Sequence, residues 1–153
     1  RAANNLGRLW IKRDSAIAAS ILQRAISALP EDVTNEDAQL SASQEPYKNL
    51  SYIIYKNLGW AKYQSKLYDS AEENLTWSVS LAERFALPDQ GGLANCLLAQ
   101  TLEQLKKTDE AIAAWESCRD NAGFGENITP DEEKWVDLAP QRLKELEDQY
   151  KPE

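Results

Sequence analysis

The residues of this chain that could carry out chemistry are few. The sequence contains no histidine and only two cysteines, Cys96 and Cys118. The lack of histidine removes the commonest general base at neutral pH and the Ser-His-Asp and Cys-His arrangements of nucleophilic catalysis. Two cysteines do not by themselves complete the four ligands of a structural zinc site. We therefore expect no catalytic residues, no metal site and no cofactor, and we expect that the protein is not an enzyme.

Other polar patterns do not supply the missing chemistry. Glu72 and Glu73 are adjacent in sequence, and neighbours on a helix point about 100° apart rather than toward one another. Gly91 and Gly92 lack the lysine and strand context of a phosphate-binding loop. These groups therefore indicate a solvated surface and a turn rather than an active site.

The two cysteines fall on opposite arms of one expected helical hairpin. A disulfide between Cys96 and Cys118 is one interpretation. Two small buried thiols are the other, and the one that we favour. Neither interpretation fixes the compartment of the protein, although the cytoplasm is favoured.

The net charge of the chain argues against some classes of partner. Seventeen basic residues stand against 25 acidic ones, for a net charge of −8. Nucleic acids and anionic lipid surfaces attract basic faces, so we expect neither as a partner. No apolar run approaches the roughly 20 residues of a membrane span, so we expect no direct membrane insertion. Since the chain starts at Arg1 and has no methionine, we expect a processed protein or a piece of a larger one, outside which a signal or anchor would lie.

The elements that must position any binding residues are helices. Apolar residues make up 42% of the chain, and residues 57–81 hold parts of two amphipathic runs joined by a short polar break. The positions that recur at helical spacing are Ile54, Leu58 and Ala61 in the first run and Tyr68, Ala71, Leu75, Ser78 and Val79 in the second. Gly59 and Ala71 are small residues within these runs, which predicts that two antiparallel helices pack closely there.

Similar hairpins are expected in residues 1–30, 46–87 and 92–122. Pro46 suits the start of the long helix expected over residues 47–64. The acidic segment 31–45 separates the first two hairpins and reads as a solvated insert, with a short helix near 35–40 as the alternative.

A last helix is expected over about residues 130–149. Thr129 and Pro130, followed by acidic residues, form a strong helix start. Its expected apolar face comprises Trp135, Val136, Leu138, Leu143 and Leu146. Pro140 should kink or divide this helix. Because its outer face is heavily charged, the helix reads as a terminal cap.

The hairpins resemble tetratricopeptide repeats. The matching positions are Leu6-Gly7 in the first hairpin, Leu58-Gly59, Tyr63, Tyr68 and Ala71 in the second, and Leu98-Ala99 and Ala111 in the third. The resemblance implies an all-α fold in a single domain over residues 1–153, an α-solenoid or right-handed superhelix of about three repeats and a capping helix. It also implies that Gly7, Gly59 and Ala99 pack against the alanine of the neighbouring arm.

The same resemblance implies a function. In such stacks the first helix of each repeat lines a concave groove that holds an extended peptide. The peptide-binding residues carried over are Asn5 and Arg8 in the first repeat, Lys56, Asn57, Trp60 and Tyr63 in the second, and Gln100 in the third, beside Cys96, Leu97 and Glu103. An asparagine amide both donates and accepts, so Asn5 and Asn57 suit a peptide backbone. Leu97 stands where some relatives place a base, so we do not expect a clamp for a C-terminal carboxylate.

Four tryptophans, Trp10, Trp77, Trp115 and Trp135, are expected in the core, whereas Trp60 lies off the apolar stripe and suits a ligand anchor. The expected function is non-catalytic binding of a protein or peptide partner. Replacing Lys56, Asn57 and Trp60 together should then abolish binding without changing stability. The alternatives are homo-oligomerisation as a scaffold domain of a larger protein, and a regulatory domain that senses a small ligand.

Overall fold

The fold is all-α, as expected from the sequence. The computed structural model describes residues 1–31, 46–122 and 128–150, and this part of the chain holds seven helices and no strand. The helices are α1 (Ala2–Trp10), α2 (Ser15–Ser27), α4 (Tyr47–Gln64), α5 (Tyr68–Arg84), α6 (Gly92–Gln104), α7 (Thr108–Asn121) and α8 (Pro130–Tyr150). The helix expected over residues 47–64 is therefore confirmed, while the expectations for the acidic segment beyond Glu31 lie outside the described residues.

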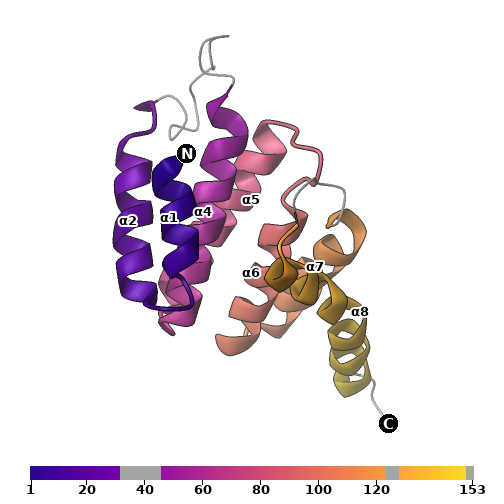
Figure 1. Cartoon of the computed structure of the whole chain (residues 1–153). Helices are drawn as coiled ribbons and strands as arrows, with labels where there is room; N and C mark the ends of the chain where they lie inside the picture. Colours follow the sequence, from indigo (N-terminus) through magenta and orange to yellow (C-terminus); the bar gives the residue numbers. More distant parts are fainter. Residues whose placement is uncertain (32–45, 123–127, 151–153) are drawn as a thin grey trace.

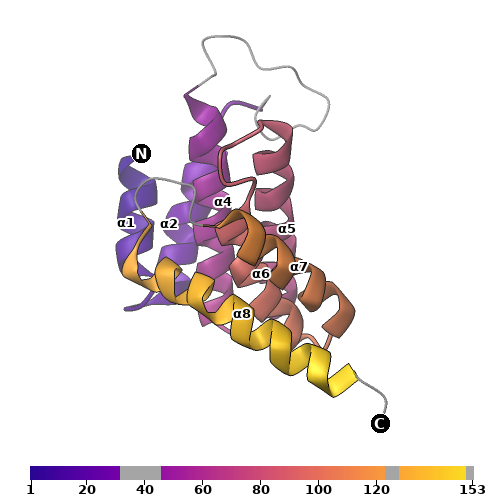
Figure 2. The same cartoon turned by 90° about the vertical axis from the view of Figure 1, so that its right-hand side faces the viewer.

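Successive helices lie side by side in hairpins (Figure 1). Helix α1 packs against α2, α4 against α5, and α6 against α7, and each pair also contacts the next through α2 with α4 and α5 with α6. Helix α8 does not continue this row. It crosses α6 and α7, and its first turn comes close to the α1 hairpin (Figure 2), where Asp131 forms an ion pair with Lys12.

The second and third hairpins turn in the same way. Lys66 and Lys106 follow the first helix of each pair with φ of 59° and 61°, the left-handed conformation in which many helices end. The amide of the next residue, Leu67 or Lys107, then closes the turn onto a carbonyl five residues back, at 2.9 Å in both hairpins. Residues 11–14 of the first hairpin contain no left-handed residue, so its turn is of a different kind.

Two helix starts are held by side chains. Asp14 accepts a hydrogen bond from the amide of Ile17 at 3.1 Å and so caps α2. Thr129 accepts from the amide of Glu132 at 3.3 Å, and the Thr129 hydroxyl also bonds the Glu132 carboxylate at 2.8 Å. This exchange fixes the Glu132 side chain at the first turn of α8.

The small residues of the hairpins are packed as closely as expected, but against other partners. The sequence predicted that Gly7 and Gly59 pack against the alanine of the neighbouring arm, and their nearest contacts are made by leucines of that arm. The atoms nearest to a Cβ at these glycines belong to Leu22 and Leu75, which follow Ala18 and Ala71 by four residues, about one helical turn. Because a leucine is longer than an alanine, it reaches the space that the missing Cβ leaves open.

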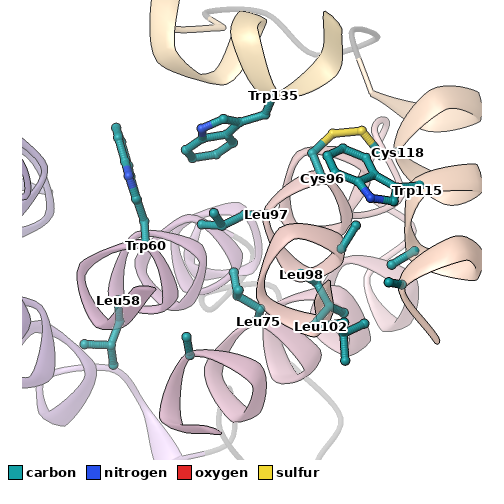
Figure 3. Packing of buried hydrophobic residues seen from close by; sticks show 14 of the residues in the cluster. Leu58, Trp60, Leu75, Cys96, Leu97, Leu98, Leu102, Trp115, Cys118 and Trp135 are labelled. Carbon is teal, nitrogen blue, oxygen red and sulfur yellow. A yellow bond between two sulfur atoms is a disulfide. The ribbon is translucent and has the colours of Figure 1, made fainter. Parts of the chain in front are cut away.

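The main core cluster runs through all three hairpins and α8, and a smaller cluster holds Tyr52, Ala82 and Ala94. Ala18, Ala71, Ala99 and Ala111 are all completely buried within the main cluster. Helices meet most closely at such positions, because a methyl group leaves room for the facing helix. Figure 3 shows part of this cluster where α4, α6, α7 and α8 meet.

Two of the four tryptophans expected in the core are less buried than expected. Trp115 and Trp135 are buried, but Trp10 and Trp77 are only partly buried. The ring of Trp77 instead meets Tyr55 edge-on, with the ring centroids 6.3 Å apart.

Helix α8 corrects two further expectations. Pro140 lies inside one continuous helix, so the expectation that it divides the helix is wrong. The proline is exposed, and buried Ala139 and Leu143 on either side of it hold the helix on the core. Leu138 belongs to the outer face, with 37% of its surface exposed.

Cys96 on α6 and Cys118 on α7 form a disulfide, with their Cα atoms 4.7 Å apart. The favoured interpretation of two free buried thiols is therefore wrong. Both residues are fully buried, and the bond ties the two helices together beside Trp115 (Figure 3). None of the described helices is long and apolar enough to cross a membrane.

Candidate binding cavity

A cavity of about 690 Å³ opens between α1, α4, the first turn of α8 and the loop that joins α5 to α6. We call it the α4 cavity. Its size lies within the range of about 300–1,000 Å³ that is usual for ligand sites. The residues that line it are Asn4, Asn5, Arg8, Asn49, Tyr52, Ile53, Lys56, Asn57, Leu87, Pro88, Asp89, Leu93 and Glu132.

Two asparagines from neighbouring hairpins meet at the cavity. The Nδ2 of Asn57 donates to the Oδ1 of Asn4 at 3.0 Å, and both side chains are buried. The Oδ1 of Asn57 is buried without a hydrogen-bond partner, although the residue is only 1% exposed. Because nearly all buried polar atoms in proteins are paired, this acceptor is a candidate contact for a donor from outside the described residues.

A buried ion pair forms another part of the wall. Lys56 on α4 donates to the carboxylate of Glu132 on α8, and the two side chains are 6% and 3% exposed. Thr129 holds the other oxygen of Glu132. The charge of Lys56 is therefore neutralised within the chain.

A second carboxylate in the wall has only neutral donors. Asp89 accepts from the hydroxyl of Tyr52 at 2.8 Å and from the amide of Gly91 at 3.2 Å. It is 7% exposed and forms no ion pair in the part of the chain that the structure describes. Burial raises the pKa of Tyr52 well above its usual value, and the charge of Asp89 and the hydrogen bond to it raise that pKa further.

The loop that carries Asp89 is held in an unusual backbone conformation. Ala86 and Gln90 have φ of 48° and 46°, and Gly91 has φ of 76°. Side chains disfavour this left-handed region, so the two non-glycine residues store strain that the surrounding hydrogen bonds must offset. Hydrogen bonds from the amide of Gly91 to the Asp89 carboxylate and from the amide of Gly92 to the Asp89 carbonyl tie this loop together.

The mouth of the cavity combines polar and apolar groups. Asn5, Arg8 and Asn49 are exposed there. Arg8 forms no ion pair with any described residue and lies beyond ion-pair distance of Asp89. The apolar part of the wall is formed by Ile53, Leu87, Pro88 and Leu93.

Three of the seven expected binding residues lie outside the α4 cavity. Trp60 is 4% exposed, because Trp135 of α8 covers it edge-on with the ring centroids 4.9 Å apart (Figure 3). Tyr63 packs against Tyr68, and the amide of Gln100 donates to a carbonyl of its own helix at 3.3 Å. The expectation that Trp60 lies off the core is wrong.

Helix α8 also covers the third helix pair at the positions where the groove was expected. Cys96 and Leu97 are buried. Glu103 accepts from the indole of Trp115 at 2.8 Å and from Arg142 of α8. These side chains hold the domain together and are not free for a ligand.

The other four expected residues, Asn5, Arg8, Lys56 and Asn57, do line the cavity together. Sequence reasoning missed four of their neighbours, Asn4, Tyr52, Asp89 and Glu132. The signal for Glu132 was present, since Thr129 with a glutamate three residues later is a capping-box pattern. Asp89 and Tyr52 gave no signal, because nothing in the sequence shows that they are in contact.

Comparison of this chain with protein-family models, with curated proteins and with solved structures finds no match.

Proposed function

We propose that this domain recognises a partner protein without catalysis and holds an extended segment of that partner in the α4 cavity. The observation that carries this proposal is the buried, unpartnered Oδ1 of Asn57. The Asn4–Asn57 pair uses one donor and one acceptor internally. A donor on Asn4 and an acceptor on Asn57 remain, and an extended peptide offers the complementary N–H and C=O groups.

The proposal includes a tetratricopeptide-like solenoid as the framework. Two observations support this part. The turns of the second and third hairpins have the same hydrogen bonds and the same left-handed residue. Each hairpin also packs on the next along the chain, which is how repeat proteins bury a continuous core.

The proposal is tested by selecting peptides from a random display library on the immobilised domain. Selected peptides should lose affinity about tenfold or more when Asn5 and Arg8 are both changed to alanine, because two hydrogen-bonding contacts at the cavity mouth are removed. Both residues are exposed, so melting should not change.

The matched control is the double change Gln23→Ala and Arg24→Ala on the exposed face of α2. It removes an amide and a guanidinium away from the cavity and should leave peptide affinity unchanged. Failure to enrich any peptide, or equal affinity of the cavity-mouth variant, would overturn the proposal.

Self-association is the second candidate, and one observation favours it. Leu6 and Leu9 on α1 are 48% and 71% exposed, and a second copy of the chain would cover such apolar side chains. Light scattering across a concentration series tests this directly. A dimer that Leu9→Lys converts to monomer would support self-association, and a monomer at all concentrations would exclude it.

A further inference from the structure

The α4 cavity buries more negative than positive charge. The buried charged side chains in its wall are two carboxylates, Asp89 and Glu132, and one cation, Lys56. Lys56 is committed to Glu132. Asp89 is left with a tyrosine hydroxyl and one amide, and a buried carboxylate without a cation is costly.

Asn57, whose Oδ1 has no hydrogen-bond partner, lines the same cavity. The cavity wall therefore combines a carboxylate without a cation and a residue with an unsatisfied acceptor, and a donor would suit both. Arg8 does not supply it, because this residue is exposed at the mouth and too far from Asp89 for an ion pair.

We infer that the α4 cavity receives a positively charged side chain of the partner, a lysine or an arginine. This inference rests on the proposed function and names the kind of residue that the partner must present. The ammonium or guanidinium group donates to Asp89, and its methylene stem packs along Ile53, Leu87 and Leu93.

Two further properties of the protein suit such a ligand. The ring of Tyr52 lies beside Asp89 and already has the Nζ of Lys56 at 5.9 Å from its centroid, so cations are accommodated on its face. The net charge of −8 draws basic segments toward the molecule and repels acidic ones.

The inference is tested by NMR titration of the ¹⁵N-labelled domain with small probes. The probes are the Nα-acetyl methylamides of lysine, arginine, norleucine and glutamate, with butylammonium as a free amine. The amide of Gly91 is the reporter, because it donates to Asp89. Lysine and arginine should shift this resonance and bind at least about tenfold more tightly than norleucine, which has the same stem without the charge.

Asp89→Asn should remove most of this preference, because it deletes the charge and keeps the shape. Asp120→Asn is the matched control, since it makes the same change at an exposed site. The comparison of lysine with norleucine on the unaltered protein needs no variant, so it decides the question even if Asp89→Asn fails to fold.

Equal binding of norleucine and lysine, preferred binding of glutamate, or no shift of Gly91 with any probe would each overturn the inference. Butylammonium is the lysine side chain without the backbone, so binding of both amines would support recognition of the charged side chain, and no binding of either would overturn the inference. The peptide selection with the Asn5 and Arg8 variant remains a separate test, so the proposed function can stand when this inference fails.

Discussion

Lys56 on α4 donates to Glu132 on α8, and both side chains are buried. The pair joins α8 to the face of α4 on which the sequence analysis predicted a bound peptide. A lysine that appears available from its position in a repeat is therefore committed to the chain itself. Since Lys56, Asn57 and Trp60 are buried, replacing them should lower stability, contrary to the expectation from sequence. The stability of each single variant should therefore be measured before its binding.

Glu132→Gln should lower the free energy of unfolding by about 3 kcal/mol or more, because it leaves the charge of Lys56 buried and unpaired. Urea unfolding followed by circular dichroism measures this. The double change Lys56→Met and Glu132→Leu is the control, because it removes both charges while keeping the volume. A single variant that costs no more than the double would show that the pair is not buried in solution.

The sequence was a good guide to the helices and a poor one to their contacts. Pro46, Pro130 and the periodic apolar residues are local signals, and the helices begin where these signals place them. Burial of Trp60 depends on where α8 docks, which no local pattern specifies. The partner of Asp89 is likewise set by a contact between residues 37 positions apart, Tyr52 and Asp89.

The same limit applies to Gly59 and to the two cysteines. Periodicity located Gly59 in a close contact but could not tell an alanine from a leucine on the facing helix. Spacing placed the two cysteines on opposite arms of a hairpin, yet only the packing of α6 on α7 brings them within bonding distance.

Trp135→Ala should destabilise the domain by about 3–5 kcal/mol, the usual cost of removing a buried aromatic side chain. It also uncovers Trp60, which meets Trp135 edge-on. The tryptophan emission of the folded variant should shift to longer wavelength and become accessible to acrylamide. Trp77→Ala is the control, because Trp77 is only partly buried, and it should cost clearly less. Equal costs would contradict the packing of α8 on α4.

Gly59→Ala should destabilise the domain by about 1–2 kcal/mol, although alanine favours helices by about 1 kcal/mol over glycine. An added Cβ would lie 2.5 Å from the Cγ of Leu75, and Leu75 is fully buried. Thermal unfolding gives the size of the effect. Adding Leu75→Ala should relieve the clash, so the cost of Gly59→Ala should shrink or vanish in that background.

Reduction of the disulfide should lower the free energy of unfolding by about 3 kcal/mol, because Cys96 and Cys118 close a loop with a sequence separation of 22. The measurement is urea unfolding with and without a reductant. The double change Cys96→Ala and Cys118→Ala should show a similar loss and no response to the reductant. Since structural disulfides persist in oxidising compartments, we expect the domain to work there rather than in the cytoplasm favoured from sequence.

The stability of the domain should fall as the pH rises above about 10, the usual pKa of tyrosine. Burial and Asp89 raise the pKa of Tyr52 in the folded state, so the unfolded chain releases this proton first. Below about pH 10 the tyrosine is protonated in both states and contributes no slope. Above it, alkali favours the unfolded chain, by up to about 1.4 kcal/mol per pH unit for one group.

Tyr52→Phe separates this group from the other titrating residues. The variant should be less stable at neutral pH by about 1–2 kcal/mol, because Asp89 loses a donor, but its stability should fall less steeply between about pH 10 and 11. Urea unfolding at a series of pH values gives both slopes. Burial also raises the pKa of Tyr55 and Tyr63, so a residual slope is expected in the variant. Identical slopes in the two proteins would mean that Tyr52 is not buried against Asp89.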